Sequence, residues 1–179
     1  MDVLEQLDQV GPLLMGVVGN ISEEDLDKST PCSAFKVRDV LEHMVGGAGQ
    51  FAAAFRQQPP SSSDMNDLLG QFGPALSDLV AAIREPGALD KTIDAPFGAV
   101  PGEAFARFVA LDGLVHGWDM ATATGQSYTP SDELVAEVDA FARQTLDLLR
   151  DGTTFGDAVE APPSATPIER LAAFTGRRV

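Results

Sequence analysis

Cysteine, histidine and basic residues are all scarce in this 179-residue sequence, which holds one cysteine, two histidines and 12 Lys and Arg against 27 Asp and Glu. The single cysteine, Cys32, excludes an intramolecular disulfide and a cysteine-rich zinc site, and it favours a reducing compartment. The net charge of −15 argues against a nucleic-acid partner, because phosphate binding needs a basic face. We therefore expect no nucleic acid among the partners of this protein.

Long uncharged apolar runs are also missing, and none reaches the roughly 18 residues that a membrane span requires. The N-terminal residues Met1–Glu5 carry acidic side chains where a signal peptide needs basic ones. These two absences predict a cytoplasmic protein without a membrane partner.

Helical periodicity, in contrast, is present along most of the chain. The length predicts one domain spanning residues 1–179, and 44% hydrophobic residues are enough for a core. Apolar residues recur every three to four positions in the segments that we expect to be helices: 2–18, 36–57, 74–85, 101–124, 131–150 and 166–174. Residues 91–100 predict a short extended segment or a hairpin, Ser131 an N-cap, and Thr166 with Glu169 a capping box. The expected fold class is all-α, a single helical bundle with short ancillary helices.

The expected helix 101–124 carries an acid and a histidine on its buried face. Asp112 and His116 are four residues apart, so they lie one above the other on the apolar stripe that includes Phe105 and Phe108. Burying a carboxylate and an imidazole is costly unless each is paired or binds a metal. Two interpretations follow: an ion pair or hydrogen-bond network inside the bundle, or two ligands of a divalent metal that needs a third ligand from another helix.

His43 is the other histidine, and it lies on the expected helix 36–57 at the edge of the apolar face. A histidine at such an edge is typical of a half-exposed residue without a special role, but it can also supply the third ligand of a His₂Asp site. Gly46, Gly47 and Gly49 follow it, and they either allow a neighbouring helix to approach closely or fray the helix. The sequence spacing leaves these alternatives open.

Three further side chains near these motifs allow a functional and a structural interpretation. Asp119 is either an acceptor that orients the His116 imidazole or a solvent-facing acid near the helix end. We expect Trp118 in the core rather than against a substrate. Cys32 is expected to serve packing rather than chemistry.

Two motifs resemble those of a known family. Residues 29–47, STPCSAFKVRDVLEHMVGG, resemble the opening "TPC…WTVRDLxxHxVGG" of the mycothiol-dependent maleylpyruvate isomerase-like metal-binding family, within the DinB/YfiT-like superfamily. Residues 112–121, DGLVHGWDMA, resemble its second motif, in which an acid precedes a histidine by four residues. The ending, residues 165–177, is similar to a subset of the family. Together these segments follow the order of the family motifs.

The resemblance implies an up-down four-helix bundle that holds one divalent ion with His43, Asp112 and His116. Zinc is the expected ion and nickel the alternative, and such a ligand set keeps coordination positions open, as catalytic sites do. The resemblance also implies a low-molecular-weight thiol such as mycothiol, which a bound metal would activate. We therefore expect a metal-dependent thiol transferase that acts on a small electrophile, and a homodimer is compatible with this expectation.

The sequence departs from the family pattern at two positions. Asp112 stands where the isomerases have Glu, which shortens the arm by one methylene, and Phe35 stands in place of the usual Trp. We also expect no counterpart of the extra C-terminal domain of the isomerases, so isomerase activity itself is not expected. The alternative function is a non-catalytic helical module that is stabilised by a metal and recruits a partner.

Overall fold

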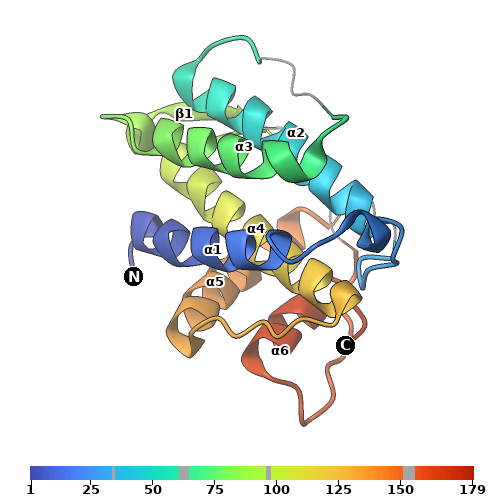
Figure 1. Cartoon of the computed structure of the whole chain (residues 1–179). Coiled ribbons are helices and arrows are strands. Elements are labelled where there is room, and N and C mark those ends of the chain that lie inside the picture. The colour runs from blue at the N-terminus through green and yellow to red at the C-terminus, as the bar shows by residue number, and fades with distance from the viewer. Residues whose placement is uncertain (34, 61–64, 96–97, 151–155) are drawn as a thin grey trace.

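Helices account for most of the structure, a computed structural model that describes residues 1–33, 35–60, 65–95, 98–150 and 156–179 (Figure 1). The longer helices are α1 (Val3–Val18), α2 (Val37–Arg56), α3 (Leu68–Ile83), α4 (Gly102–Thr124), α5 (Asp132–Thr145) and α6 (Pro167–Phe174). Short 3₁₀ helices follow at Glu23–Asp25, Ala88–Asp90 and Leu146–Leu148, and strands β1 (Thr92–Ala95) and β2 (Gly98–Pro101) form a hairpin. The expected helical class with a short hairpin is confirmed.

Two of the expected helix starts are confirmed by side-chain caps. The Ser131 hydroxyl accepts a hydrogen bond from Leu134 N at 3.2 Å at the start of α5. At α6 the Thr166 hydroxyl accepts from the backbone of Glu169, whose carboxylate accepts from Thr166 N. Each cap satisfies amide donors that have no partner within their own helix.

The expected bounds of two helices are wrong. The third helix was expected to begin at Pro74, but α3 begins at Leu68 and keeps Pro74 inside it. Asp67 caps this earlier start by accepting from Gly70 N, and the buried side chains of Leu68 and Phe72 anchor the additional turn in the core. Tertiary packing therefore outweighs the hydrogen bond that proline removes from the helix. At the other end of the chain, α5 stops at Thr145 and continues only as a 3₁₀ turn, not to residue 150.

The hairpin leads directly into α4. Ile93 pairs with Val100 in the antiparallel register, and Gly102 N donates to Lys91 O at 2.7 Å where the helix begins. Pro96, which contributed to the hairpin expectation, lies outside the described residues. The entry to α4 is thus fixed by the backbone, and this matters because α4 carries two of the predicted ligands.

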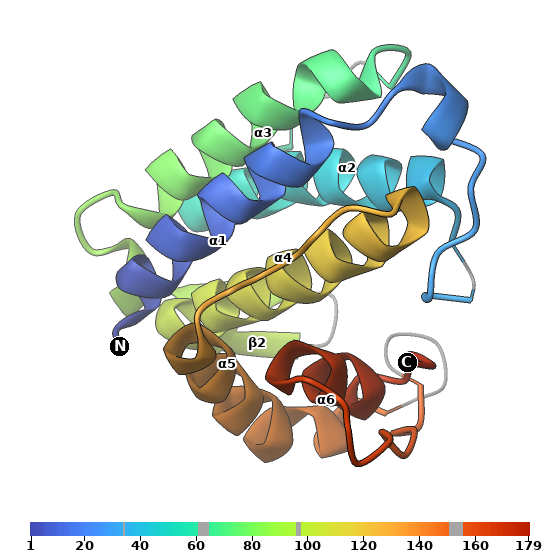
Figure 2. The ribbon, with the colours of Figure 1, turned by 60° about the horizontal axis from the view of Figure 1, so that its bottom comes forward.

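Helix α4 occupies the middle of the fold. Figure 2 shows α1, α2 and α3 on one side of it and α5 with α6 on the other. Helix α2 packs along α3, and α1 packs along α4. Trp118 is buried in the core as expected. This packing is compatible with the up-down four-helix bundle, which stays a prediction, as does the single domain spanning residues 1–179.

Within the described parts of the chain, none of the helices combines the length and the apolarity that crossing a bilayer requires.

Candidate metal centre

The centre begins with two side chains one turn apart on α4. His116 is buried, whereas the side chain of Asp112 is 36% exposed. The glycine after each of them lets a neighbour approach: a Cβ on Gly113 would lie 2.9 Å from a methyl of Val10 in α1. Close packing against α1 holds this part of α4 in place, and with it the direction in which Asp112 and His116 point.

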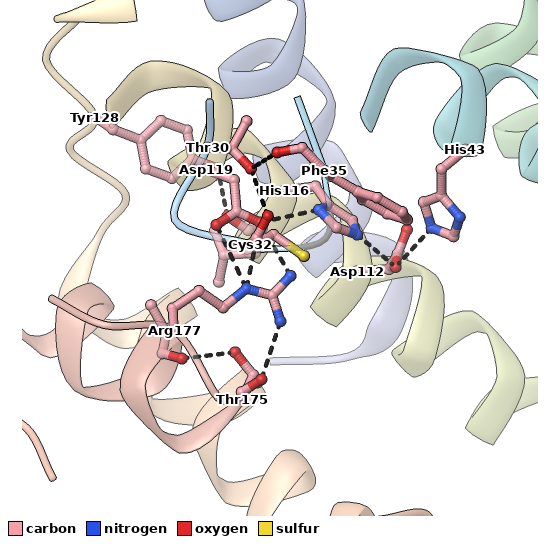
Figure 3. Close-up of polar contacts among 12 residues, drawn as sticks. Thr30, Cys32, Phe35, His43, Asp112, His116, Asp119, Tyr128, Thr175 and Arg177 are labelled. Atoms are coloured by element: carbon pink, nitrogen blue, oxygen red, sulfur yellow. Dashed lines mark hydrogen bonds and ion pairs between the residues drawn. The ribbon is translucent and has the colours of Figure 1, made fainter. Parts of the chain in front are cut away.

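His43 of α2 meets this pair from the opposite helix. His43 Nε2 lies 3.2 Å from Asp112 Oδ1, and His116 Nε2 lies 3.5 Å from the same oxygen. The two imidazole rings have centroids 5.0 Å apart and face each other edge-on (Figure 3). The structure thus brings together the three residues that the sequence analysis predicted as ligands.

The three donor groups fit a divalent metal. One ligand atom from each of His43, Asp112 and His116 lies within 4.8 Å of the others. Bonds of about 2.1 Å to a tetrahedral zinc place neighbouring ligand atoms about 3.4 Å apart, close to the two separations around Asp112 Oδ1. A metal-free hydrogen-bond network is the competing interpretation, and these separations alone are compatible with both.

Asp119 is fully buried and contacts the back of the His116 ring, so the alternative of a solvent-facing acid is wrong. Its Oδ2 lies 3.0 Å from His116 Nδ1. Because an ionised carboxylate can only accept, Nδ1 carries a proton and donates it to Asp119, and Nε2 points toward Asp112 and His43, where it can bind a metal once it carries no proton. This arrangement is typical of metal-binding histidines, whose second nitrogen donates to a carboxylate.

Arg177, in the C-terminal segment, completes the arrangement and was missed by the sequence analysis. Its Nη2 donates to Asp119 Oδ2 at 3.0 Å, its Nε lies 3.3 Å from the same oxygen, and its Nη1 donates to Thr175 O. Gly176 has φ of +96°, a left-handed conformation that favours glycine and turns the chain toward Asp119 after α6. Figure 3 shows the resulting row from Arg177 through Asp119 and His116 to Asp112 and His43.

The loop before α2 covers the imidazoles. The ring of Phe35 has its centroid 6.0 Å from that of His43 and 6.2 Å from that of His116. Thr30 holds this loop closed, because its hydroxyl donates to Phe35 O at 2.7 Å and also contacts Cys32 O. The half-buried Cys32 lies beside Arg177 and Asp119 (Figure 3). The Thr-Pro-Cys motif therefore shapes the cover over the candidate site.

The electrostatics of the cluster favour an ionised Asp112. Burial by itself would raise the pKa of Asp112, but the positive charges of the imidazoles and the hydrogen bond from His43 lower it to about 2. The hydrogen bond to Asp112 raises the pKa of His43 above its ordinary value of 6.5, although burial opposes this shift. A carboxylate that stays ionised at neutral pH is the form that binds a metal.

Comparisons with known proteins give a matching family and similar sequences. The family described as mycothiol maleylpyruvate isomerase N-terminal domain matches residues 7–121, a range that includes His43, Asp112 and His116 and ends before Arg177. Two proteins described as uncharacterized, from the CDC 1551 / Oshkosh and ATCC 25618 / H37Rv strains of Mycobacterium tuberculosis, are each 34% identical over 183 residues and cover the whole of both chains. No solved structure matches significantly.

Proposed function

Because this chain belongs to the mycothiol maleylpyruvate isomerase N-terminal domain family, we propose that His43, Asp112 and His116 bind one divalent cation and that the centre serves a thiol-transfer reaction. The proposed cation is Zn²⁺, with Ni²⁺ as the alternative. The proposed cosubstrate is a low-molecular-weight thiol such as mycothiol, and the other substrate is a small electrophile.

The observation that carries this proposal is the convergence of three donors from two helices on one point, with one side of that point accessible. The side chains of His43 and Asp112 are 38% and 36% exposed, whereas His116 is buried behind them. Three protein ligands and an accessible side are what catalytic metal sites have, whereas structural zinc sites have four protein ligands. The ligand set therefore supports a reactive centre.

A divalent cation bound there would supply a Lewis acid that makes a thiol a better nucleophile at neutral pH. The residues around it have separate tasks. Asp119 orients His116 through the hydrogen bond at Nδ1, and Arg177 fixes Asp119. Phe35 shields the two imidazoles from water on one side. In the proposed reaction the thiol loses its proton to solvent and its sulfur forms a bond to an electrophilic carbon. At the same time a halide leaves with its electron pair, an epoxide C–O bond opens onto its oxygen, or the C=C π pair of an unsaturated carbonyl compound moves toward the carbonyl. In the last two cases a proton from solvent completes the product thioether.

The test combines metal content with thiol turnover. The protein is purified without a histidine tag, its metal content is measured, and it is incubated with mycothiol and a panel of epoxides, alkyl halides and unsaturated carbonyl compounds. Product thioethers are detected by mass spectrometry before and after chelation. We expect turnover that depends on metal, and a metal-loaded protein that converts none of these compounds would contradict the enzymatic part of the proposal.

A non-catalytic role for the metal is the second candidate, and one observation favours it. The ligands come from α2 and α4, so a bound ion would join two helices that are distant in sequence. Such a cross-link stabilises a fold without any chemistry. Chelation distinguishes the two candidates. It should abolish activity if the metal is catalytic, and it should lower the folding stability if the metal is structural.

A further inference from the structure

A small cavity adjoins the candidate metal centre. It has a volume of about 40 Å³ and lies between α1, α2, α3 and α4. His43 and Asp112 form part of its wall, so the cavity and the centre share two side chains. Anything bound in the cavity would therefore lie next to the proposed reaction.

The wall of the cavity is almost entirely apolar. Apart from His43 and Asp112, the residues that line the cavity are aliphatic, aromatic, methionine or glycine, for example Val10, Leu79 and Phe51. Among these lining residues, all within the described part of the chain, there is no lysine, arginine, serine, threonine or amide side chain. Arg177, which lies close to the centre, is engaged by Asp119 and Thr175 and is not part of the wall.

The size and lining of the cavity restrict what it can hold. A water-sized group needs about 10–15 Å³ of such volume, so the cavity has room for about three heavy atoms. Apolar cavities stay dry and bind apolar guests, because water finds no hydrogen-bond partners in them. A carboxylate placed in the part of the cavity away from His43 and Asp112 would lose its hydration without gaining a positive partner, because that part of the wall is apolar.

We propose that this cavity binds a short, uncharged alkyl group of the electrophile, about three carbons long, and so selects against substrates with a carboxylate at that end. The inference rests on the proposed function for the identity of the reaction, but the binding itself requires only the cavity. The same wall disfavours a dicarboxylate whose second carboxylate has to enter the cavity, since away from His43 and Asp112 it would meet only apolar groups.

Binding is tested directly on the full-length protein as purified, with its metal content measured in the same sample. The probes are xenon, 1-propanol and propanoate, and the readout is the shift of methyl resonances of Val10, Leu14, Leu79 and Val109 in ¹³C-methyl-labelled protein. We expect saturable shifts with xenon and 1-propanol. Propanoate is compared in a sample treated with a chelator, in which no cation can bind its carboxylate, and there we expect it to bind at least tenfold more weakly. Absence of xenon binding, or propanoate binding as strong as that of 1-propanol, would overturn the inference.

A matched pair of variants locates the binding. Gly47 lines the cavity, and a Cβ there would meet only the ring of Phe51 at 3.6 Å, so Gly47→Val adds side-chain volume at the cavity wall. Gly16, exposed on α1 and outside the cavity, has nothing within 4 Å of the corresponding position, so Gly16→Val is the control. We expect Gly47→Val to weaken xenon binding at least tenfold and Gly16→Val to leave it unchanged. Equal effects of the two variants would contradict the location.

The inference and the proposed function can fail separately. If the protein contains no metal but binds xenon and 1-propanol, the cavity is supported as a binding site and the thiol-transfer proposal is contradicted. If the protein contains metal and converts charged and uncharged electrophiles equally well, the proposed selectivity is contradicted and the metal centre is supported. Loss of propyl-electrophile turnover in Gly47→Val with full metal content supports both.

Discussion

Arg177 and Asp119 form a buried ion pair in which Arg177 Nη2 lies 3.0 Å from Asp119 Oδ2, across 58 residues of sequence. The carboxylate is fully buried, and the same oxygen contacts His116 Nδ1. The C-terminal segment is therefore joined to the proposed metal centre by one carboxylate. The family match covers residues 7–121 and therefore includes Asp119 but not Arg177.

Removing the arginine should affect both stability and metal binding. Arg177→Met leaves the Asp119 carboxylate buried without its cation, which typically lowers the free energy of unfolding by about 3–5 kcal/mol. The orientation of His116 is loosened as well, and we expect zinc affinity to fall about 10–100-fold. Urea unfolding and competition with a chromophoric chelator measure the two quantities.

The neighbouring arginine provides the control for this prediction. Arg178 is exposed, so Arg178→Met makes the same chemical change one position away. Asp119→Asn combined with Arg177→Met should be less destabilised than the sum of the single variants, because the unpaired charge is gone. Equal effects of Arg177→Met and Arg178→Met would show that the ion pair has no role in the centre.

The pH dependence of stability should change sign when metal is added. The pKa of His43 is raised, chiefly by its hydrogen bond to Asp112, so the metal-free protein has the full stabilisation from this pair below pH 6.5. That stabilisation is lost as the pH rises through the raised pKa of His43. Zinc and the proton compete for the same nitrogen of His43. The stabilisation by added zinc should therefore increase as the pH rises through the pKa of His43.

Melting temperatures between pH 5 and 9, with and without zinc, measure this effect. Asp112 does not titrate in that range, because its pKa is lowered to about 2. His43→Gln removes the group responsible and should flatten the difference between the two curves. Parallel curves for the original protein with and without zinc would contradict the assignment of His43 as a ligand.

Gly117 lies where α4 packs closely against Tyr128, so a larger residue there should lower stability. A Cβ on Gly117 would lie 2.5 Å from Tyr128 Oη, and this tyrosine is held by a hydrogen bond from its hydroxyl to Leu114 O. Gly117→Ala should therefore destabilise the protein by about 1–3 kcal/mol through overpacking. Gly16→Ala, at an open helical position, should instead stabilise it by up to about 1 kcal/mol.

Thermal unfolding of both glycine variants provides the comparison. In a Tyr128→Leu background the phenol is gone, so Gly117→Ala should cost less than it does alone. A stabilising Gly117→Ala would mean that Tyr128 moves away at no cost and does not hold this face of α4.

Metal removal should abolish thiol transfer and leave the helices folded. The hydrophobic core contains residues of α1 to α6 but none of the three proposed ligands, and two of these proposed ligands are partly exposed at its edge. We expect the helical circular dichroism signal to persist after chelation at 25 °C. Loss of the helical signal together with the metal would favour the non-catalytic, metal-stabilised alternative.

The sequence predicts the clustering of His43, Asp112 and His116 better than it predicts the residues that hold them in place. Asp112 and His116 share a helix face because of their spacing, and with only two histidines in the chain His43 was the remaining candidate. Arg177 could not be found in this way, because it reaches Asp119 through the turn at Gly176 and no local periodicity reports such a contact. The similarity of residues 165–177 to a subset of the family was the available signal.

The helix bounds show the same limit. Local rules place a helix start at Pro74, because proline is favoured in the first turn. The structure instead starts α3 at Leu68, because Leu68 and Phe72 are buried against other helices. Burial in the tertiary structure decided this boundary, and the sequence of one segment does not contain that information.

The metal stoichiometry of Asp112→Asn tests the central claim most directly. Elemental analysis of the untagged protein should give one zinc or nickel per chain, and Asp112→Asn should lose it, since the amide oxygen is a much weaker ligand than the carboxylate. Glu42→Gln, at an exposed position beside His43, should keep full metal content. A metal-free original protein, or an Asp112→Asn variant with unchanged metal content, would contradict the account.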